Sequence, residues 1–162
     1  MPLSAISVVV ADAGPLIALG RLDQLGLLSK LFAQVQVPNT VLAECVAKPE
    51  LADARRIQVA VGNGWLIPCE EPDFDAPGLQ AGERAAIGRA IRIGAGLLAD
   101  DMAARLQAAN CGLAVVGTLG VLVRAKRLGL LPAVAPAIEQ LRDSGHYLGA
   151  RSIAAAMALA GE

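Results

Sequence analysis

One stretch of the chain decides the fold. Residues 8–15 read Val-Val-Val-Ala-Asp-Ala-Gly-Pro, an apolar, mostly β-branched run that ends at a carboxylate and is followed by glycine and proline. A continuous apolar run is typical of a strand that is buried on both faces, as in a parallel sheet. Proline is well placed in the first turn of a helix. The stretch therefore predicts a buried strand, a carboxylate at its carboxyl end, and then a helix.

The same alternation continues outward from this stretch. Further apolar runs predict strands at residues 35–37, 65–68, 97–99 and 113–116. Apolar residues at helical spacing, bounded by glycine, proline or capping residues, predict helices at residues 16–22, 39–47, 51–61, 81–93, 102–110 and 119–126, with more helix from 134 onward. Strands that alternate with helices imply right-handed crossovers. We therefore expect an α/β fold with a parallel sheet covered on both faces.

Composition limits the function classes. The chain has 162 residues, of which 55% are hydrophobic, so a substantial core and one domain are expected, with residues 132–162 as a helical extension. The net charge is −1, so nucleic-acid binding would need a local basic patch. Its one Trp, one Tyr and two Phe make a base-stacking sheet improbable. The three cysteines form no paired motif, and the sequence has no signal-peptide or membrane-span pattern. Both observations favour a soluble cytoplasmic protein.

Acidic residues stand at positions where strands end or helices begin. Asp12 follows the first strand, and Asp100 and Asp101 follow the fourth. Glu44 lies in an apolar helical stretch, and Glu83 precedes isoleucines at helical spacing. Taken singly, each has a structural interpretation as a turn residue, a solvated helix face or a helix N-cap. Ligands of parallel sheets, however, bind beyond the carboxyl ends of the strands, where several of these residues are expected.

Convergence of these carboxylates would require a counter-ion. Two carboxylates 4–5 Å apart repel by about 3–4 kcal/mol at an effective dielectric of 20. The repulsion of several such pairs would destabilise the fold by an amount comparable with its total stability, which is about 5–15 kcal/mol for a domain. A hard divalent cation removes the conflict, and Mg²⁺ suits it best because it keeps waters for a phosphate substrate; Mn²⁺ suits the same chemistry.

Five short motifs, in this order, resemble the PIN-domain family, in particular its prokaryotic branch of VapC-type proteins. They are Asp-Ala-Gly-Pro-Leu-Ile-Ala-Leu at 12–19, Val-Pro-Asn-Thr-Val-Leu-Ala-Glu at 37–44, Gly-Glu-Arg-Ala-Ala-Ile at 82–87, Leu-Leu-Ala-Asp-Asp at 97–101, and Gly-Thr-Leu-Gly-Val-Leu at 117–122. The resemblance runs from about Val8 to the carboxyl terminus. It implies a three-layer α/β/α fold with a five-stranded parallel sheet in the order 3-2-1-4-5, followed by extra carboxyl-terminal helices.

The resemblance also implies an activity. PIN-domain proteins of this branch are metal-dependent ribonucleases, often the toxins of toxin–antitoxin pairs. By analogy, Mg²⁺ or Mn²⁺ would activate water to hydrolyse an RNA phosphodiester, leaving a 5′-phosphate and a 3′-hydroxyl. A small antitoxin protein and a second copy of the chain are the implied partners.

The resemblance implies which residues bind the metal, by their positions in the motifs. Asp12 matches the first-strand aspartate and Glu44 matches the helix glutamate. Glu83 stands where many relatives have aspartate, and Asp101 matches the fourth acidic position, with Asp100 as a competitor. These five residues are the predicted metal-binding set.

Supporting roles follow from the same motifs. Thr118 is expected at the end of the fifth strand as a supporting hydroxyl, while His146, the one histidine, is expected at the surface or a helix end without a chemical role. The RNA backbone needs local cations, and the candidates are Arg84, Arg105, Arg124, Lys126 and Arg127.

Two departures from the family pattern keep a second interpretation open. Gly14 stands where many PIN domains have Ser, Thr or Asn, and Glu83 is one methylene longer than aspartate. The alternative is a PIN-like interaction module with weak or no nuclease activity, whose partner would dock on the apolar residues of 153–159. A phosphoacceptor receiver domain is disfavoured because no aspartate ends the third strand.

Overall fold

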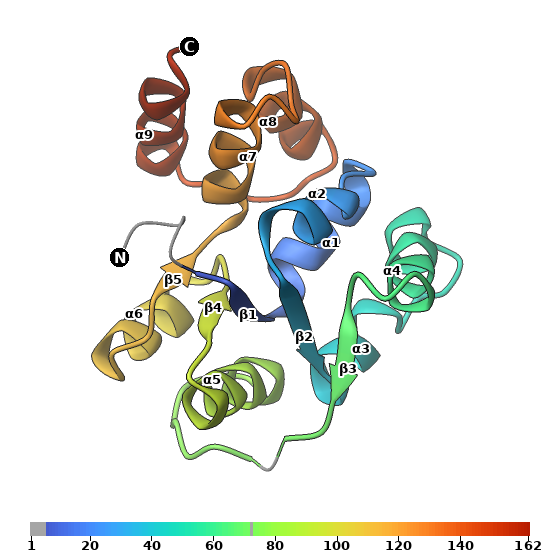
Figure 1. The fold of residues 1–162 in the computed structure, drawn as a ribbon, viewed down its shortest axis with the longest axis vertical. Helices are drawn as coiled ribbons and strands as arrows, with labels where there is room; N and C mark the ends of the chain where they lie inside the picture. Colours follow the sequence, from blue (N-terminus) through green and yellow to red (C-terminus); the bar gives the residue numbers. More distant parts are fainter. Residues whose placement is uncertain (1–5, 72) are drawn as a thin grey trace.

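A parallel sheet forms the centre of the molecule. The computed structural model describes residues 6–71 and 73–162, and its sheet has five strands in the order β3-β2-β1-β4-β5 (Figure 1). The strands are β1 (Val8–Ala11), β2 (Gln34–Pro38), β3 (Ile67–Cys69), β4 (Gly96–Leu98) and β5 (Val115–Val116). The predicted fold class and strand order are confirmed.

The strand that the opening stretch predicts lies in the middle of this sheet. β1 pairs in parallel with β2, where Val8 is beside Gln34, and with β4, where Val9 is beside Gly96. Val9 and Val10 are 0% exposed. The continuous apolar run is thus explained, because a central strand that is covered on both faces has no side open to water.

Helices cover both faces of the sheet. They are α1 (Ala13–Arg21), α2 (Gly26–Leu31), α3 (Asn39–Cys45), α4 (Ala52–Gly62), α5 (Ala81–Ile93), α6 (Met102–Asn110), α7 (Thr118–Arg127), α8 (Ala135–Asp143) and α9 (Ala150–Ala160). Figure 1 shows α5 and α6 on one side of the strands, α1, α2 and α7 on the other, and α8 and α9 beyond α7. No helix in residues 6–71 and 73–162 has the length and apolar character needed to cross a bilayer.

Several element boundaries differ from the sequence prediction. The spacing after Pro15 predicts one helix at 16–22, whereas the chain forms α1 and then, after a turn at Asp23 whose φ is 54°, the second helix α2, which the spacing does not predict. Aspartate is among the few residues that tolerate this left-handed conformation. The helix predicted at 39–47 is α3, which begins at Asn39 because Pro38 ends β2 and leads directly into it, and which ends at Cys45.

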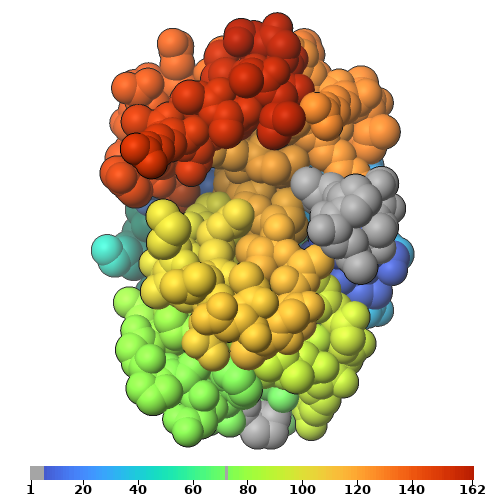
Figure 2. All heavy atoms as spheres, turned by 90° about the vertical axis from the view of Figure 1, so that its left-hand side faces the viewer, coloured from blue at the N-terminus to red at the C-terminus, as the bar shows by residue number. Residues whose placement is uncertain are grey.

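The last residue of the chain joins three helices. The carboxylate of Glu162 accepts hydrogen bonds from the backbone N–H groups of Val134 and Ala135 at the start of α8, at 2.7 and 3.0 Å. It also accepts one from Lys126 Nζ of α7, at 2.9 Å. The Val134 amide, Lys126 and the Ala135 amide together lower the pKa of Glu162 to about 2. Figure 2 shows the carboxyl-terminal residues, in red, gathered at one end of the molecule.

Candidate active site

Asp12 is placed by the sheet itself. It follows β1, and its backbone N–H donates to the Leu98 carbonyl of β4 at 2.9 Å. Asp12 is the N-cap residue of α1, but its side chain makes no capping hydrogen bond to that helix. The residue is 7% exposed, and with Thr118 it is one of two buried polar residues in the described part of the chain. The Asp12 carboxylate therefore lies at the carboxyl end of the central strand and does not cap the helix that follows it.

Glu44 reaches the same place from α3. Gly82 of α5 marks the meeting point, because a Cβ on this glycine would lie 3.2 Å from Glu44 Oε2 and 3.8 Å from Asp12 Oδ1. A larger residue at position 82 would thus press on both carboxylates. The missing side chain leaves the space in which Glu44 and Asp12 face each other.

Glu83 follows this glycine in the first turn of α5. Its Oε2 accepts the backbone N–H of Gln80 at 2.9 Å, and the Gln80 side chain accepts the N–H of Glu83 in return. This is a reciprocal capping box, which satisfies two donors that a helix end leaves open. Glu83 is half-buried, so its carboxylate serves the helix and also borders the acidic cluster.

The two adjacent aspartates after β4 face different ways. Asp101 is the N-cap of α6, and its Oδ2 accepts the Ala104 N–H at 3.0 Å. Asp100 instead accepts the N–H of Thr118 at 2.7 Å and its hydroxyl at 2.6 Å, one on each carboxylate oxygen. Asp101 is thereby left as the acidic residue of this turn that faces the cluster, while Asp100 ties the turn to the start of α7.

The electrostatics of Asp12 show that the carboxylates share one environment. Burial is the main cause that raises the pKa of Asp12 to about 6, the Ala13 amide lowers it, and the charges of Glu83, Glu44 and Asp101 raise it further. Glu44 of α3, Glu83 of α5 and Asp101 before α6 thus lie near enough to Asp12 for their charges to act on its pKa. Asp100 is different: burial would raise its pKa, but the interactions with His146 and Thr118 lower it.

The acidic set fits a cation that keeps much of its hydration. Among residues 6–71 and 73–162, no three or more Asp, Glu, His or Cys side chains are arranged so that they could hold a metal ion as a group. The donors are all carboxylate oxygens, which hard cations prefer. Mg²⁺ is bound through one or two carboxylates, several waters and substrate phosphates, and an open set of this kind suits it. The chemistry of the donors suits the metal that the family resemblance implies, and metal binding by these residues stays a prediction.

Two of the predicted RNA-binding residues lie beside this set. Arg84 follows Glu83, and its Nε donates to Asp73 Oδ1 at 2.9 Å. Arg105 of α6 donates from Nη1 to the Ala99 carbonyl at 2.8 Å. Both side chains thus fix the immediate surroundings of acidic residues.

The other three lie on α7 and contact neighbouring helices. The Arg124 guanidinium is 5.9 Å from the centre of the Phe32 ring. Lys126 Nζ donates to the Ala160 carbonyl at 2.7 Å, and Arg127 Nη2 donates to the Leu159 carbonyl at 3.0 Å. Lys126 and Arg127 thus anchor the end of α9. RNA contact by any of the five stays a prediction.

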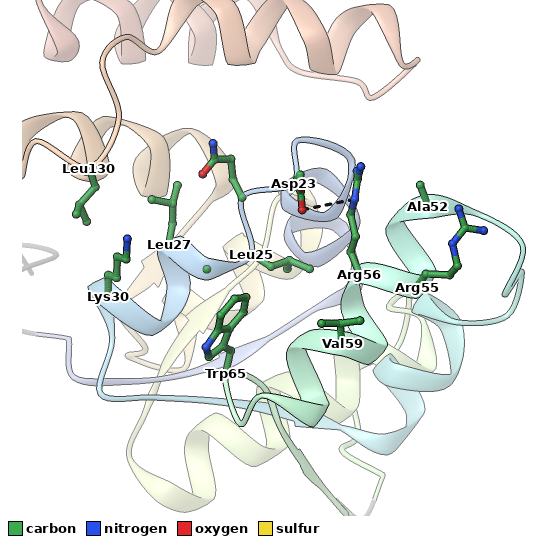
Figure 3. A pocket seen from close by; sticks show the side chains of 12 residues that line it. Asp23, Leu25, Leu27, Lys30, Ala52, Arg55, Arg56, Val59, Trp65 and Leu130 are labelled. Carbon is green, nitrogen blue, oxygen red and sulfur yellow. Dashed lines mark ion pairs between the residues drawn. The ribbon is translucent and has the colours of Figure 1, made fainter.

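Two pockets in the described part of the chain are lined by residues outside the acidic set. One pocket of about 430 Å³ lies between α2 and α4, with Lys30 and Trp65 on one wall and Val59 and Arg56 on the other (Figure 3). Arg56 pairs there with Asp23 at 3.5 Å. This pocket is at the far end of α1 from Asp12, and its cationic lining excludes it as a cation site. A second groove, of about 580 Å³, runs between α7 and α9 and has a mainly apolar lining.

The side chain of His146 is more buried than the sequence suggests. It lies between α8 and α9, yet its side chain is only 13% exposed and its Nε2 is 3.8 Å from Asp100 Oδ2. That nitrogen is buried and makes no hydrogen bond within the described part of the chain. The expected helix-end position is found, since the His146 N–H donates to the Leu141 carbonyl at the end of α8, at 2.9 Å. Its side chain is more buried than that of a surface residue, because the loop after α8 folds back onto the turn after β4. No local pattern indicates this, since the contact joins residues 46 positions apart.

Comparisons with known proteins agree with this fold. Residues 8–162 match the DUF3368 family, which is described as a PIN domain. No curated protein matches the sequence. Among solved structures, the chain is similar to a PilT N-terminus domain protein, SSO1118, from the hyperthermophilic archaeon Sulfolobus solfataricus P2. The two share 17% identity at a TM-score of 0.56, over 73% of this chain and 92% of that one, a likeness of fold alone. Because the family matches nearly the whole length of this chain, the chain belongs to the PIN-domain family.

Proposed function

We propose that this chain is a metal-dependent ribonuclease that hydrolyses RNA phosphodiester bonds. The observation that supports it most is the buried carboxylate of Asp12 at the carboxyl end of the sheet, which lies with Glu44 beside the space that Gly82 leaves open and whose pKa the charges of Glu83, Glu44 and Asp101 raise. Carboxylates this close disfavour one another's ionised form, and a bound cation would compensate their charge. Membership of the PIN-domain family supports a nuclease.

The acidic residues would hold Mg²⁺ or Mn²⁺. Asp12, Glu44, Glu83 and Asp101 form the set, while Asp100 is excluded because Thr118 occupies both of its oxygens. When bound, the ion lowers the pKa of a water and neutralises charge that develops on the phosphate. Asp12 supplies a buried carboxylate, and Asp101 keeps one oxygen on the Ala104 amide and leaves the other for the site.

The chain's own cations would orient the substrate. Arg84 and Arg105 are held next to the acidic set by their contacts with Asp73 and the Ala99 carbonyl. A fixed guanidinium loses little freedom when it binds a phosphate, and its planar fork suits phosphate oxygens. We assign these two residues to the RNA backbone near the cleaved bond.

The proposal includes a protein partner. A toxin of this class would act on cytoplasmic RNA and be held by a small antitoxin. The apolar groove between α7 and α9, bordered by the exposed Leu128 and Leu159, is the surface that we assign to an antitoxin or to a second copy of the chain. Arginines at its border favour an acidic partner segment.

The second candidate is a PIN-like interaction module without nuclease activity. It is favoured by the open arrangement of the carboxylates in the described residues and by the engagement of Glu83 in its capping box. Calorimetric titration with MgCl₂ separates the two. A nuclease binds Mg²⁺ through Asp12, so Asp12→Asn abolishes the heat of binding, whereas a module of this kind gives no such heat.

The decisive experiment is cleavage of a labelled single-stranded RNA with MgCl₂. We expect Asp12→Asn to reduce the rate by at least about 100-fold, since loss of even an outer partner of a metal ligand costs up to that much. Asp143→Asn, which alters an exposed carboxylate at the end of α8, is the matched control and leaves the rate unchanged. EDTA abolishes cleavage by the wild type. Unchanged cleavage by pure Asp12→Asn protein overturns the proposal.

A further inference from the structure

A buried imidazole lies beside the site without a role in the proposed reaction. His146 Nε2 is buried, makes no hydrogen bond in the part of the chain described, and is 3.8 Å from Asp100 Oδ2. Buried polar atoms are nearly always hydrogen-bonded, so an exception needs a physical reason. The carboxylate of Asp100 is the polar group that the structure places beside this nitrogen.

Asp100 is held from several sides at once. Thr118 donates both its N–H and its hydroxyl to the carboxylate, at 2.7 and 2.6 Å. Gly117 leaves no spare room, since a Cβ there would lie 2.9 Å from Asp100 Oδ1 and 2.7 Å from Arg105 Nη1. The carboxylate is thus enclosed by the start of α7, by α6 and by the loop that carries His146.

This enclosure fixes the turn between β4 and α6. Arg105 binds the Ala99 carbonyl of the turn at 2.8 Å, and the Ala99 N–H binds the Val116 carbonyl of β5 at 3.0 Å. Asp101 follows Asp100 directly, so the direction of its carboxylate depends on the backbone that these contacts hold. Contacts of this kind orient ligands and are costly to remove.

We infer that His146 is a positioning residue, which through Asp100 fixes the turn that presents Asp101 to the acidic cluster. The inference rests on the proposed function. It makes the α8–α9 segment part of the site and not an accessory to it.

The first test needs neither metal nor substrate. In a double-mutant cycle of urea unfolding with EDTA present, His146→Leu and Asp100→Asn are combined. We expect the two changes to be non-additive by about fivefold or more in the unfolding equilibrium constant, as for residues in contact. Tyr147→Phe, in the exposed neighbour, is the control and is additive with Asp100→Asn. Additivity of His146→Leu overturns the inference.

The second test concerns positioning. We expect His146→Leu to weaken Mg²⁺ binding about tenfold in calorimetry and to lower kcat for RNA with little change in KM. His146→Gln recovers most of both, because its amide nitrogen reaches the place of Nε2. A purely structural role would lower the melting temperature and leave kcat of the folded protein unchanged, which overturns the inference. Failure of the wild type to bind Mg²⁺ instead overturns the proposed function.

Discussion

Asp12 holds a carboxyl group where its own charge is disfavoured. It is 7% exposed, and burial together with the charges of Glu83, Glu44 and Asp101 raises its pKa to about 6. A carboxyl with a raised pKa in the folded chain binds protons that the unfolded chain has already released. Stability therefore falls as the pH rises from about 4 to about 6, and the cost is complete above that range. Metal binding requires the charged form, so the residue exchanges stability for function.

This exchange predicts that Asp12→Asn stabilises the protein. Without metal, near pH 8, the variant should be more stable than the wild type by up to about 3 kcal/mol, since the pKa shift is about two units. The gain should vanish near pH 4, where the wild-type carboxyl is protonated in the folded chain. Urea unfolding with EDTA at both pH values measures it. Asp143→Asn is the control, and equal stability of Asp12→Asn and wild type near pH 8 would contradict the explanation.

At the scale of elements, the first turn of α5 combines two tasks. Gln80 and Glu83 close the helix end by their capping box, and Gly82 between them leaves space for the carboxylates of Glu44 and Asp12. Glycine in a helix costs about 1 kcal/mol relative to alanine. Gly82 therefore lowers the stability of α5, and its missing Cβ leaves room for the two carboxylates.

We therefore predict that Gly82→Ala separates stability from activity. The added Cβ would lie 3.2 Å from Glu44 Oε2 and must displace that carboxylate, so Mg²⁺ affinity and RNA cleavage should fall about tenfold or more. The unfolding free energy should change by less than about 1 kcal/mol, because helix propensity offsets the crowding. Gly62→Ala is the matched control, since nothing lies within 4 Å of its added Cβ. It should stabilise α4 and leave cleavage unchanged; equal activity of both variants would refute the role of Gly82.

The sequence predicts the elements that local patterns encode and misses those set by distant contacts. The apolar run before Asp12 predicts a buried strand, and the resemblance to the PIN-domain family implies the strand order 3-2-1-4-5 that the sheet has. Spacing alone cannot show the break at Asp23, because one left-handed residue redirects the chain. Nor can it show that Asp100 faces Thr118 while Asp101 faces the cluster, since that choice depends on a helix 18 residues away. The burial of the His146 side chain against Asp100 is likewise set by a distant contact, so the sequence does not show it.

At the scale of the whole molecule, the carboxylate of Glu162 is one of the contacts that hold the carboxyl-terminal helices to the rest of the chain. Glu162 accepts from the first amides of α8 and from Lys126 of α7, while Lys126 and Arg127 hold the carbonyls that end α9. A negative charge at the amino end of α8 also complements the helix dipole. Because the loop between α8 and α9 carries His146, this anchor is connected to the turn that presents Asp101.

We predict that Glu162→Gln loosens this end of the molecule in a pH-dependent way. The hydrogen bonds lower the pKa of Glu162 to about 2, so the carboxylate stabilises the folded chain above its ordinary pKa of 4.5, and that stabilisation is lost as the pH falls from there toward 2. The variant should thus melt a few degrees below the wild type near pH 7, and the difference should shrink below about pH 4.5. Hydrogen exchange should be faster in α8 and α9 while β1 stays protected. Glu139→Gln, an exposed change on α8, should alter neither property; if Glu162→Gln melts and exchanges like the wild type near pH 7, the anchor has no role in holding the extension.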